Sequence, residues 1–291
     1  MEWTLNIIIA SIMLVIFVVL LAMIFIGSMR DSFVFRPTHS YLSTTQREHK
    51  DIRVGDVMTR WFDNAADAIL FYLHGNNGNI SDREYVAEFA ELSHLNLVLI
   101  DYRGYGMSNG HASLANMRED ADAVMSVIRQ QYNDQNIIIM SESLGSIPAS
   151  YLAAHYAVRG VIVLSGISSF NDMADEFKGI MKGILRYTIS GMGNVETNAQ
   201  LLARTQSPIL LAHSPEDEIV TFACAKKNLE ACPQARLVVI GGGHATPVIS
   251  EENLIALLEF AGIQTHPNKY DRWRTKMRTI GHILSFYVID M

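Results

Sequence analysis

Short apolar runs alternate with longer amphipathic segments through most of this chain. The apolar runs carry few polar residues, whereas the segments between them repeat apolar positions at helical spacing. Strands that are apolar throughout and separated by helices favour a mostly parallel sheet with helices on both faces, an α/β fold. We predict strands at 68–73, 95–100, 137–140, 161–164, 208–212 and 237–240. We predict helices at 81–92, 114–131, 222–230 and 251–261, and one more that follows the strand at 137–140 and ends at about 156.

The N-terminal segment, residues 1–30, has a different pattern. No charged residue lies between Glu2 and Arg30, and positions 5–26 are almost wholly apolar. At 1.5 Å per residue this run extends about 33 Å, enough to cross a hydrocarbon core of ~30 Å. A cleaved signal peptide is the alternative, since small residues stand at 27 and 28, but a basic leading region is missing and the run is too long. We therefore predict an uncleaved single-pass transmembrane helix.

The charges flanking this run indicate an orientation. Arg30, Arg36 and Arg47 follow it, whereas only Glu2 and the α-amino group precede it. Because positive flanks tend to stay in the cytoplasm, we expect the rest of the chain to face the cytoplasm.

The remaining chain divides into a linker at 31–50, a main domain at 51–265 and a tail at 266–291. The long connection within the domain, 166–207, predicts a small helical cap whose apolar face either lines an acyl pocket or packs on the core. The tail is basic and then apolar, which favours either a helix held on anionic lipid or a solvated end. The apolar cap positions are Phe177, Ile180, Met181, Ile184, Leu185 and Tyr187, and the basic tail positions are Lys269, Arg272, Arg274, Lys276 and Arg278.

A candidate nucleophile follows the predicted strand at 137–140. The sequence Ser141-Glu142-Ser143-Leu144-Gly145 places a serine between small residues two positions before and after it, at a strand-to-helix turn. Such a tight turn is typical of a nucleophile elbow, which exposes the serine hydroxyl above the ends of the strands. If Ser141 were the nucleophile, Ile139 would occupy a position that must be small. The pattern therefore favours Ser143.

Two further polar groups follow later strands. The acidic run 216–218 and the histidine His244 each come just after the end of a predicted strand, where open α/β sheets place their sites. The order Ser143, Asp217, His244 is the order of the serine, acid and base in α/β-hydrolases. The loop at 74–79 is rich in glycine and asparagine, and with the N–H groups of Asn76 and Leu144 it predicts an oxyanion hole.

These segments resemble the membrane-anchored α/β-hydrolase-domain serine hydrolases, a group of esterases, lysophospholipases and protein depalmitoylating thioesterases. The resemblance covers about 35–261 and is carried by FYLHGNNGN, LVLIDYRGYGMSNG, SESLGSIPA, SPILLAHSPEDEIV and GGGHATP. It implies that Asp217, rather than either neighbouring glutamate, is the triad acid and that His244 is the base. The chain departs from the group at Ser141 and Ser214, where glycine is usual.

Composition limits the other functions. The net charge of −7 gives no support to a nucleic-acid partner. The two cysteines, Cys224 and Cys232, are expected to be buried thiols, and no spacing of ligands predicts a metal site or a cofactor. We predict a membrane-tethered serine hydrolase that cleaves ester or thioester bonds of lipid-like or acylated substrates. A catalytically silent scaffold that binds a lipid or a partner, or a serine peptidase, remains the alternative.

Overall fold

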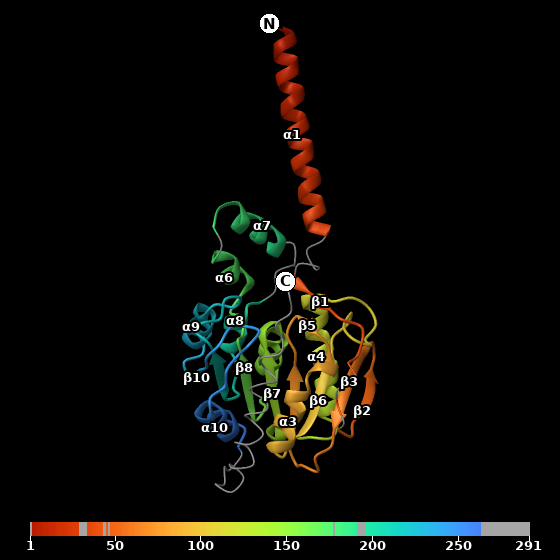
Figure 1. Ribbon diagram of the computed structural model, residues 1–291, viewed down its shortest axis with the longest axis vertical. Helices are drawn as coiled ribbons and strands as arrows, with labels where there is room; N and C mark the ends of the chain where they lie inside the picture. Colours follow the sequence, from red (N-terminus) through yellow and green to blue (C-terminus); the bar gives the residue numbers. More distant parts are fainter. Residues whose placement is uncertain are drawn as a thin grey trace.

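The computed structural model describes residues 2–28, 34–42, 45, 47–176, 178–190 and 196–262. Within them, an eight-stranded sheet runs in the order β10-β9-β8-β7-β4-β6-β3-β2, and β1 pairs with β5 in a second, two-stranded sheet (Figure 1). Neighbours from β10 to β6 are parallel, whereas β3 pairs antiparallel with both β6 and β2. The strands are β1 (Arg36–Pro37), β2 (Lys50–Val54), β3 (Val57–Phe62), β4 (Ile69–Leu73), β5 (Asn77–Gly78), β6 (Asn96–Asp101), β7 (Ile137–Glu142), β8 (Gly160–Leu164), β9 (Ile209–His213) and β10 (Arg236–Val239).

Helices cover both faces of the large sheet, and each face has its own apolar cluster. Along β4, Phe71 points to one face and Tyr72 to the other, because successive side chains of a strand alternate. The first cluster includes α4, α5 and α9, and the second includes α3 and α10. The helices are α1 (Glu2–Ser28), η1 (Ile80–Asp82), α3 (Glu84–Leu92), α4 (Leu114–Ile128), η2 (Asp134–Asn136), η3 (Ser143–Gly145), α5 (Ser146–His155), α6 (Phe170–Asp175), α7 (Gly179–Ser190), α8 (Asn198–Leu202), α9 (Phe222–Ala231) and α10 (Glu251–Phe260).

The six predicted strands are confirmed as β4 and β6 to β10. The structure differs from the prediction in one additional hairpin and in the start of one helix. The hairpin of β2 and β3 was not predicted, because β2 is an edge strand whose residues are mostly exposed and polar. Helix α3 begins at Glu84 rather than near Ser81, whose hydroxyl instead donates to Asn79 Oδ1 at 2.6 Å. Asn79 caps the short helix η1 that precedes α3.

The expected linker at 31–50 is packed on the domain over its described residues. Phe35 is buried in the first apolar cluster, and the N–H of Arg36 donates to the carbonyl oxygen of Asn76 at 3.0 Å. The Tyr41 hydroxyl donates to Oδ2 of Asp101 at 2.5 Å, and β2 begins at Lys50. These contacts make the segment part of the domain surface, next to the glycine-rich loop.

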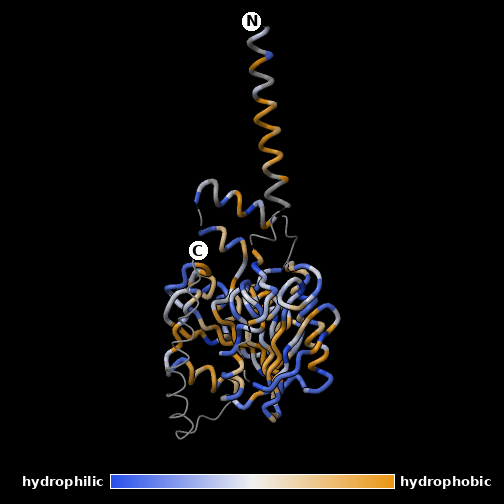
Figure 2. The backbone as a smooth tube through the Cα atoms, turned by 45° about the vertical axis from the view of Figure 1, so that its right-hand side comes forward, coloured by the Kyte–Doolittle hydropathy of each residue, from blue (hydrophilic) through white to orange (hydrophobic). Residues whose placement is uncertain are grey.

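The first helix, α1, projects away from the domain (Figure 1), and its described residues are mostly hydrophobic (Figure 2). Its side chains are described at 3, 6, 7, 11–22 and 24. When only the described residues are considered, no helix is long and apolar enough to cross a membrane. The expectation of a transmembrane anchor therefore stays a prediction.

The connection between β8 and β9 contains α6, α7 and α8, and α7 contacts α1. Figure 1 shows α6 and α7 on the side of the domain from which α1 projects. Of the predicted apolar cap face, Ile184 and Leu185 are half-buried and Tyr187 is exposed, while the side chains at 177, 180 and 181 lie outside the described residues. The tail at 266–291 also lies outside them. Cys224 and Cys232 are free and buried, as predicted.

The buried carboxyl of Asp101 gives a prediction about stability and pH. Burial raises the pKa of Asp101 to about 6 from 3.8, although hydrogen bonds from Tyr41 and from the N–H of Ile80 oppose this shift. Between pH 4 and 6 the folded protein therefore binds more protons at this carboxyl than the unfolded chain does. The contribution of Asp101 to the unfolding free energy should therefore fall as pH rises through this window, by up to roughly 1.4 kcal/mol per pH unit.

The comparison with Asp101→Asn isolates this effect, because asparagine does not titrate. Chemical denaturation at several pH values should show the stability of the wild type falling relative to the variant between pH 4 and 6. Above that window the difference should level off. A difference that is flat between pH 4 and 6 would contradict the assignment.

Candidate active site

The turn after β7 has the backbone geometry of a nucleophile elbow. Ser143 has φ +48°, a strained conformation for a residue with a side chain, and it stands between β7 and α5. A Cβ on Gly145 would lie 2.1 Å from the carbonyl oxygen of Leu73, so only glycine permits this close approach to β4. Ser141 is fully buried within β7, between β4 and β8. Ser143 is the partly accessible serine of the motif.

The structure brings the predicted serine, histidine and aspartate together. Nε2 of His244 lies 2.9 Å from Oγ of Ser143, and Nδ1 of His244 lies 2.8 Å from Oδ2 of Asp217. Asp217 follows β9 and His244 follows β10, while Ser143 follows β7, so the three meet at the carboxyl end of the parallel strands. Hydrogen bonds link the three side chains in series, which is the arrangement that activates a serine hydroxyl as a nucleophile.

The carboxylate of Asp217 is held in its ionised form. Burial acts to raise its pKa, but hydrogen bonds from His213 and His244 outweigh burial and hold the pKa of Asp217 well below its usual range. Oδ1 also accepts from the N–H groups of Ile219 at 3.0 Å and Val220 at 2.8 Å. These donors fix the orientation of the carboxylate beneath the imidazole.

The two neighbouring glutamates have a different task. Glu216 accepts from the N–H of Gly242 at 3.2 Å, and Glu218 accepts from the N–H of His244 at 3.0 Å. Both carboxylates thus bind the backbone of the histidine loop, and only Asp217 reaches the imidazole ring. The acidic run 216–218 therefore holds both the side chain of His244 and the loop that carries it.

The glycine-rich loop after β4 lies directly against the elbow. An added Cβ on Gly75 would be 3.4 Å from Cβ of Ser143. The carbonyl oxygen of Asn76 accepts from the Tyr105 hydroxyl at 2.8 Å, and the side-chain amide of Asn76 donates to the carbonyl oxygen of Val34 at 3.1 Å. These two hydrogen bonds fix the position of Asn76. Leu144 is in the first turn of η3, where N–H groups have no acceptor within the helix. Leu144 therefore follows Ser143 directly in the chain, and Asn76 follows Gly75, the loop residue that lies against Ser143.

The side chain of Glu142 joins this loop to the elbow. Its Oε1 accepts from the N–H of Gly75 and lies within 3.2 Å of the guanidinium of Arg83, and Oε2 accepts from the Tyr85 hydroxyl at 2.6 Å. Burial acts to raise the pKa of Glu142. The positive charge of Arg83 and hydrogen bonds from Tyr72, Tyr85 and Gly75 outweigh it and lower the pKa to about 2. Glu142 is therefore an anion that holds the glycine-rich loop beside Ser143.

Glu142→Gln should loosen this clamp, because an amide cannot balance the buried charge of Arg83. We expect kcat to fall by roughly 10²-fold with little change in KM, since a displacement of about 1 Å in a catalytic group has this effect. Steady-state kinetics on an ester substrate measures both constants. Glu84→Gln, which removes a more exposed carboxylate that pairs with Arg47, is the matched control. An unchanged kcat in Glu142→Gln would show that the clamp is not needed.

The pattern of the sequence did not reveal Glu142, Arg83 or His213. Glu142 lies inside the elbow motif, but its partner Arg83 comes from another segment, and only the packing of that segment on the elbow joins them. His213 is the last residue of β9, and its Nε2 lies 3.4 Å from Oδ2 of Asp217. An ionisable residue at the end of a buried strand was the available signal for His213. Among the described residues no cluster of ligands fits a metal ion.

Comparison with known proteins agrees with this architecture. A family model described as serine aminopeptidase, S33, matches residues 64–190. A solved Pyrococcus furiosus esterase superposes with a TM-score of 0.63 at 18% identity, covering 79% of this chain and 97% of its own. The chain has the α/β-hydrolase fold. The sheet order, the elbow after β7 and the positions of the three polar residues are those expected of an α/β-hydrolase.

Two relatives by sequence carry the name of α/β-hydrolase domain-containing proteins. Alpha/beta hydrolase domain-containing protein 17C of Mus musculus is 28% identical over 219 residues, which cover 74% of this chain and 65% of that protein. Protein 17B of Homo sapiens is 29% identical over 220 residues, covering 74% of this chain and 73% of its own. The matched part of the chain therefore spans just under two thirds of the length of the first of these relatives.

Proposed function

We propose that this protein is a serine hydrolase that cleaves carboxylic ester or thioester bonds through Ser143, His244 and Asp217. The observation that carries the proposal is the unbroken series of hydrogen bonds from Asp217 through His244 to Ser143. The strained elbow and the adjoining loop of Asn76 supply the other parts that acyl transfer needs. Esterases among the proteins of similar fold support the same class of reaction.

In the proposed reaction, His244 takes the hydroxyl proton of Ser143 while Oγ attacks the acyl carbon. The N–H groups of Asn76 and Leu144 stabilise the oxyanion of the tetrahedral intermediate. Its collapse breaks the ester or thioester bond, and the leaving oxygen or sulfur takes the proton from His244. Water, deprotonated by His244, then hydrolyses the acyl-enzyme to a carboxylic acid and free Ser143. Asp217 holds the imidazole tautomer and stabilises the imidazolium throughout.

The proposed substrates are lipid-like or acylated molecules at a membrane. The apolar sequence at 5–26 is the proposed anchor, and the arginines that follow it favour a cytoplasmic domain. Helix α7 of the cap contacts α1, which would hold the cap near the bilayer. The basic tail at 266–291 is a second candidate for lipid contact. Flotation with anionic vesicles should depend on residues 1–30, and protease protection in sealed vesicles would report the orientation.

One assay tests the reaction and its alternatives. A fluorophosphonate probe should label Ser143 of the full-length protein, and hydrolysis should favour long-chain over acetyl esters and thioesters. A peptidase is the second candidate, because the matching family model is described as a serine aminopeptidase. Aminoacyl-naphthylamides therefore belong in the panel. Labelling without turnover of esters or thioesters would overturn the proposal, and the absence of labelling would favour a silent scaffold.

A further inference from the structure

A cavity of about 310 Å³ lies between the cap and the main part of the domain. Its walls come from the beginnings of α4 and α5, from the segment after β8 and from the cap. Leu114, Ile147, Ile167 and Phe170 make part of the wall apolar, and Arg118 places a guanidinium in the same wall. This combination suits an amphiphilic ligand, with an apolar part and a charged group held a short distance apart.

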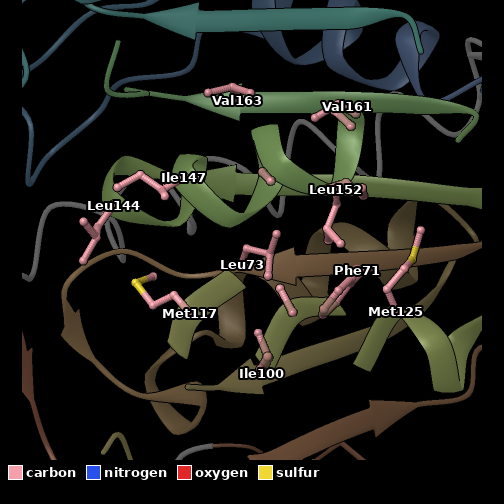
Figure 3. Close-up of a cluster of buried hydrophobic side chains, with 14 of the residues drawn as sticks. Phe71, Leu73, Ile100, Met117, Met125, Leu144, Ile147, Leu152, Val161 and Val163 are labelled. Atoms are coloured by element: carbon pink, nitrogen blue, oxygen red, sulfur yellow. The ribbon is translucent and has the colours of Figure 1, made fainter. Parts of the chain in front are cut away.

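The cavity begins close to the proposed nucleophile. Ile147 is four residues after Ser143, so the two are about one turn apart, roughly 6–8 Å along the helix axis. The Ser146 hydroxyl donates to the carbonyl oxygen of Ser143 at 2.6 Å and accepts from the N–H of Ile167 at 3.1 Å. Figure 3 shows Leu144 and Ile147 next to each other at one end of the apolar cluster. The same short segment therefore carries the elbow and a wall of the cavity.

Arg118 forms no ion pair with a carboxylate among the described residues, although the charge of Glu196 acts on it. One of its amino groups donates to the carbonyl oxygen of Glu196 at 2.7 Å, but its buried Nε has no hydrogen-bond partner there. The carboxylate of Glu196 pairs instead with Arg204, and Arg186, the other arginine of the cavity, pairs with Asp175.

The positive charge of Arg118 is half-buried. Burial lowers the pKa of Arg118, which means that its charge is poorly solvated. A half-buried guanidinium with an unused donor is a site where an anionic oxygen binds favourably, since hydrogen bonds between charged groups are the strong ones.

We propose that Arg118 recognises an anionic group on the substrate, a carboxylate or a phosphate oxygen, while the apolar wall holds the adjoining hydrocarbon. The substrate class is then an acyl ester or thioester that carries a negative charge a few carbon atoms from the bond that is cleaved. This inference rests on the hydrolase function proposed above. The guanidinium of Arg118, in the same wall as Leu114 and Ile147, would select such a molecule over a neutral ester of equal length.

Matched esters test the proposal on the full-length protein in detergent. The neutral substrate is p-nitrophenyl hexanoate, and the anionic one is the mono-p-nitrophenyl ester of hexanedioic acid, which adds a terminal carboxylate. Lysophosphatidate against monoacylglycerol gives the phosphate comparison. Arg118→Met should lower kcat/KM for one or both anionic substrates by about 10- to 100-fold, mostly through KM, and leave the neutral ones within about twofold. Arg118→Lys should be intermediate, since it keeps the charge without the fork of donors.

The control is Arg129→Met, an arginine at the end of the same helix that lies outside the cavity and pairs with Asp134. This variant should change kcat/KM for neither the anionic nor the neutral substrate. A second test needs no variant: in the wild type, KM for the anionic ester should rise with salt and KM for the neutral one should not. Equal effects of Arg118→Met on neutral and anionic esters, or a salt-insensitive KM, would overturn the inference and leave the hydrolase function standing. Absence of all ester hydrolysis and of fluorophosphonate labelling would overturn both.

Discussion

Ser143→Ala should abolish turnover, with kcat falling by about 10⁴- to 10⁶-fold on any ester that the wild type cleaves. The change removes Oγ, the atom that is proposed to form the acyl-enzyme and that is hydrogen-bonded to Nε2 of His244. It removes little packing, because Ser143 is partly exposed, so thermal unfolding by circular dichroism should shift by no more than a few degrees. Kinetics and unfolding on the same preparation separate loss of chemistry from loss of fold.

Ser141→Ala is the matched control for this prediction. The two serines are two residues apart in one motif, but Ser141 is fully buried within β7 and its hydroxyl is 3.5 Å from the carbonyl oxygen of Ile162. We expect its variant to retain turnover within about tenfold, because a small buried residue is replaced by another in the space beneath the elbow. Turnover that survives in Ser143→Ala, or is lost instead in Ser141→Ala, would refute the assignment of the nucleophile.

The sequence predicted the parts of this fold that depend on local pattern. Buried strands such as β7 are apolar throughout, and small residues on both sides of Ser143 mark a tight turn, so both are visible in a short window of sequence. The edge strand β2 has no such pattern, because solvent covers most of its residues. The segment at 31–50 looked like a linker for the same reason, although Phe35 inserts into the core.

The contacts around the site were harder to predict, because they join distant segments. The pairing of Glu142 with Arg83 depends on how the loop after β4 folds over the elbow. Arg118, whose Nε has no hydrogen-bond partner among the described residues, becomes notable only because it lines a cavity together with residues of the cap. In each case the residue type is ordinary in the sequence, and its significance comes from burial and from the partner that it has or lacks.

In the acidic run 216–218, the structure identifies the carboxylate that contacts His244, which the order of residues alone does not. Asp217→Asn should therefore lower kcat. Asparagine matches aspartate in shape, but its amide favours the wrong imidazole tautomer and cannot stabilise the imidazolium, so kcat should fall by about 10⁴-fold. In the wild type, hydrogen bonds from His213 and His244 hold the pKa of Asp217 well below its usual range. The carboxylate therefore stays ionised at neutral pH, and the stability that it contributes should be lost only as pH falls into the acid range below 3.8.

Glu218→Gln supplies the comparison that isolates the imidazole. This side chain accepts from the backbone N–H of His244, and glutamine keeps an acceptor oxygen for that bond. We expect its kcat to stay within about tenfold of the wild type, because the loop keeps its position while only a charge outside the ring contact is removed. A loss in Glu218→Gln as large as that in Asp217→Asn would mean that the histidine depends on its loop rather than on its carboxylate partner. Sequence order alone does not distinguish these adjacent acids, whereas the 2.8 Å contact with Nδ1 of His244 belongs to Asp217.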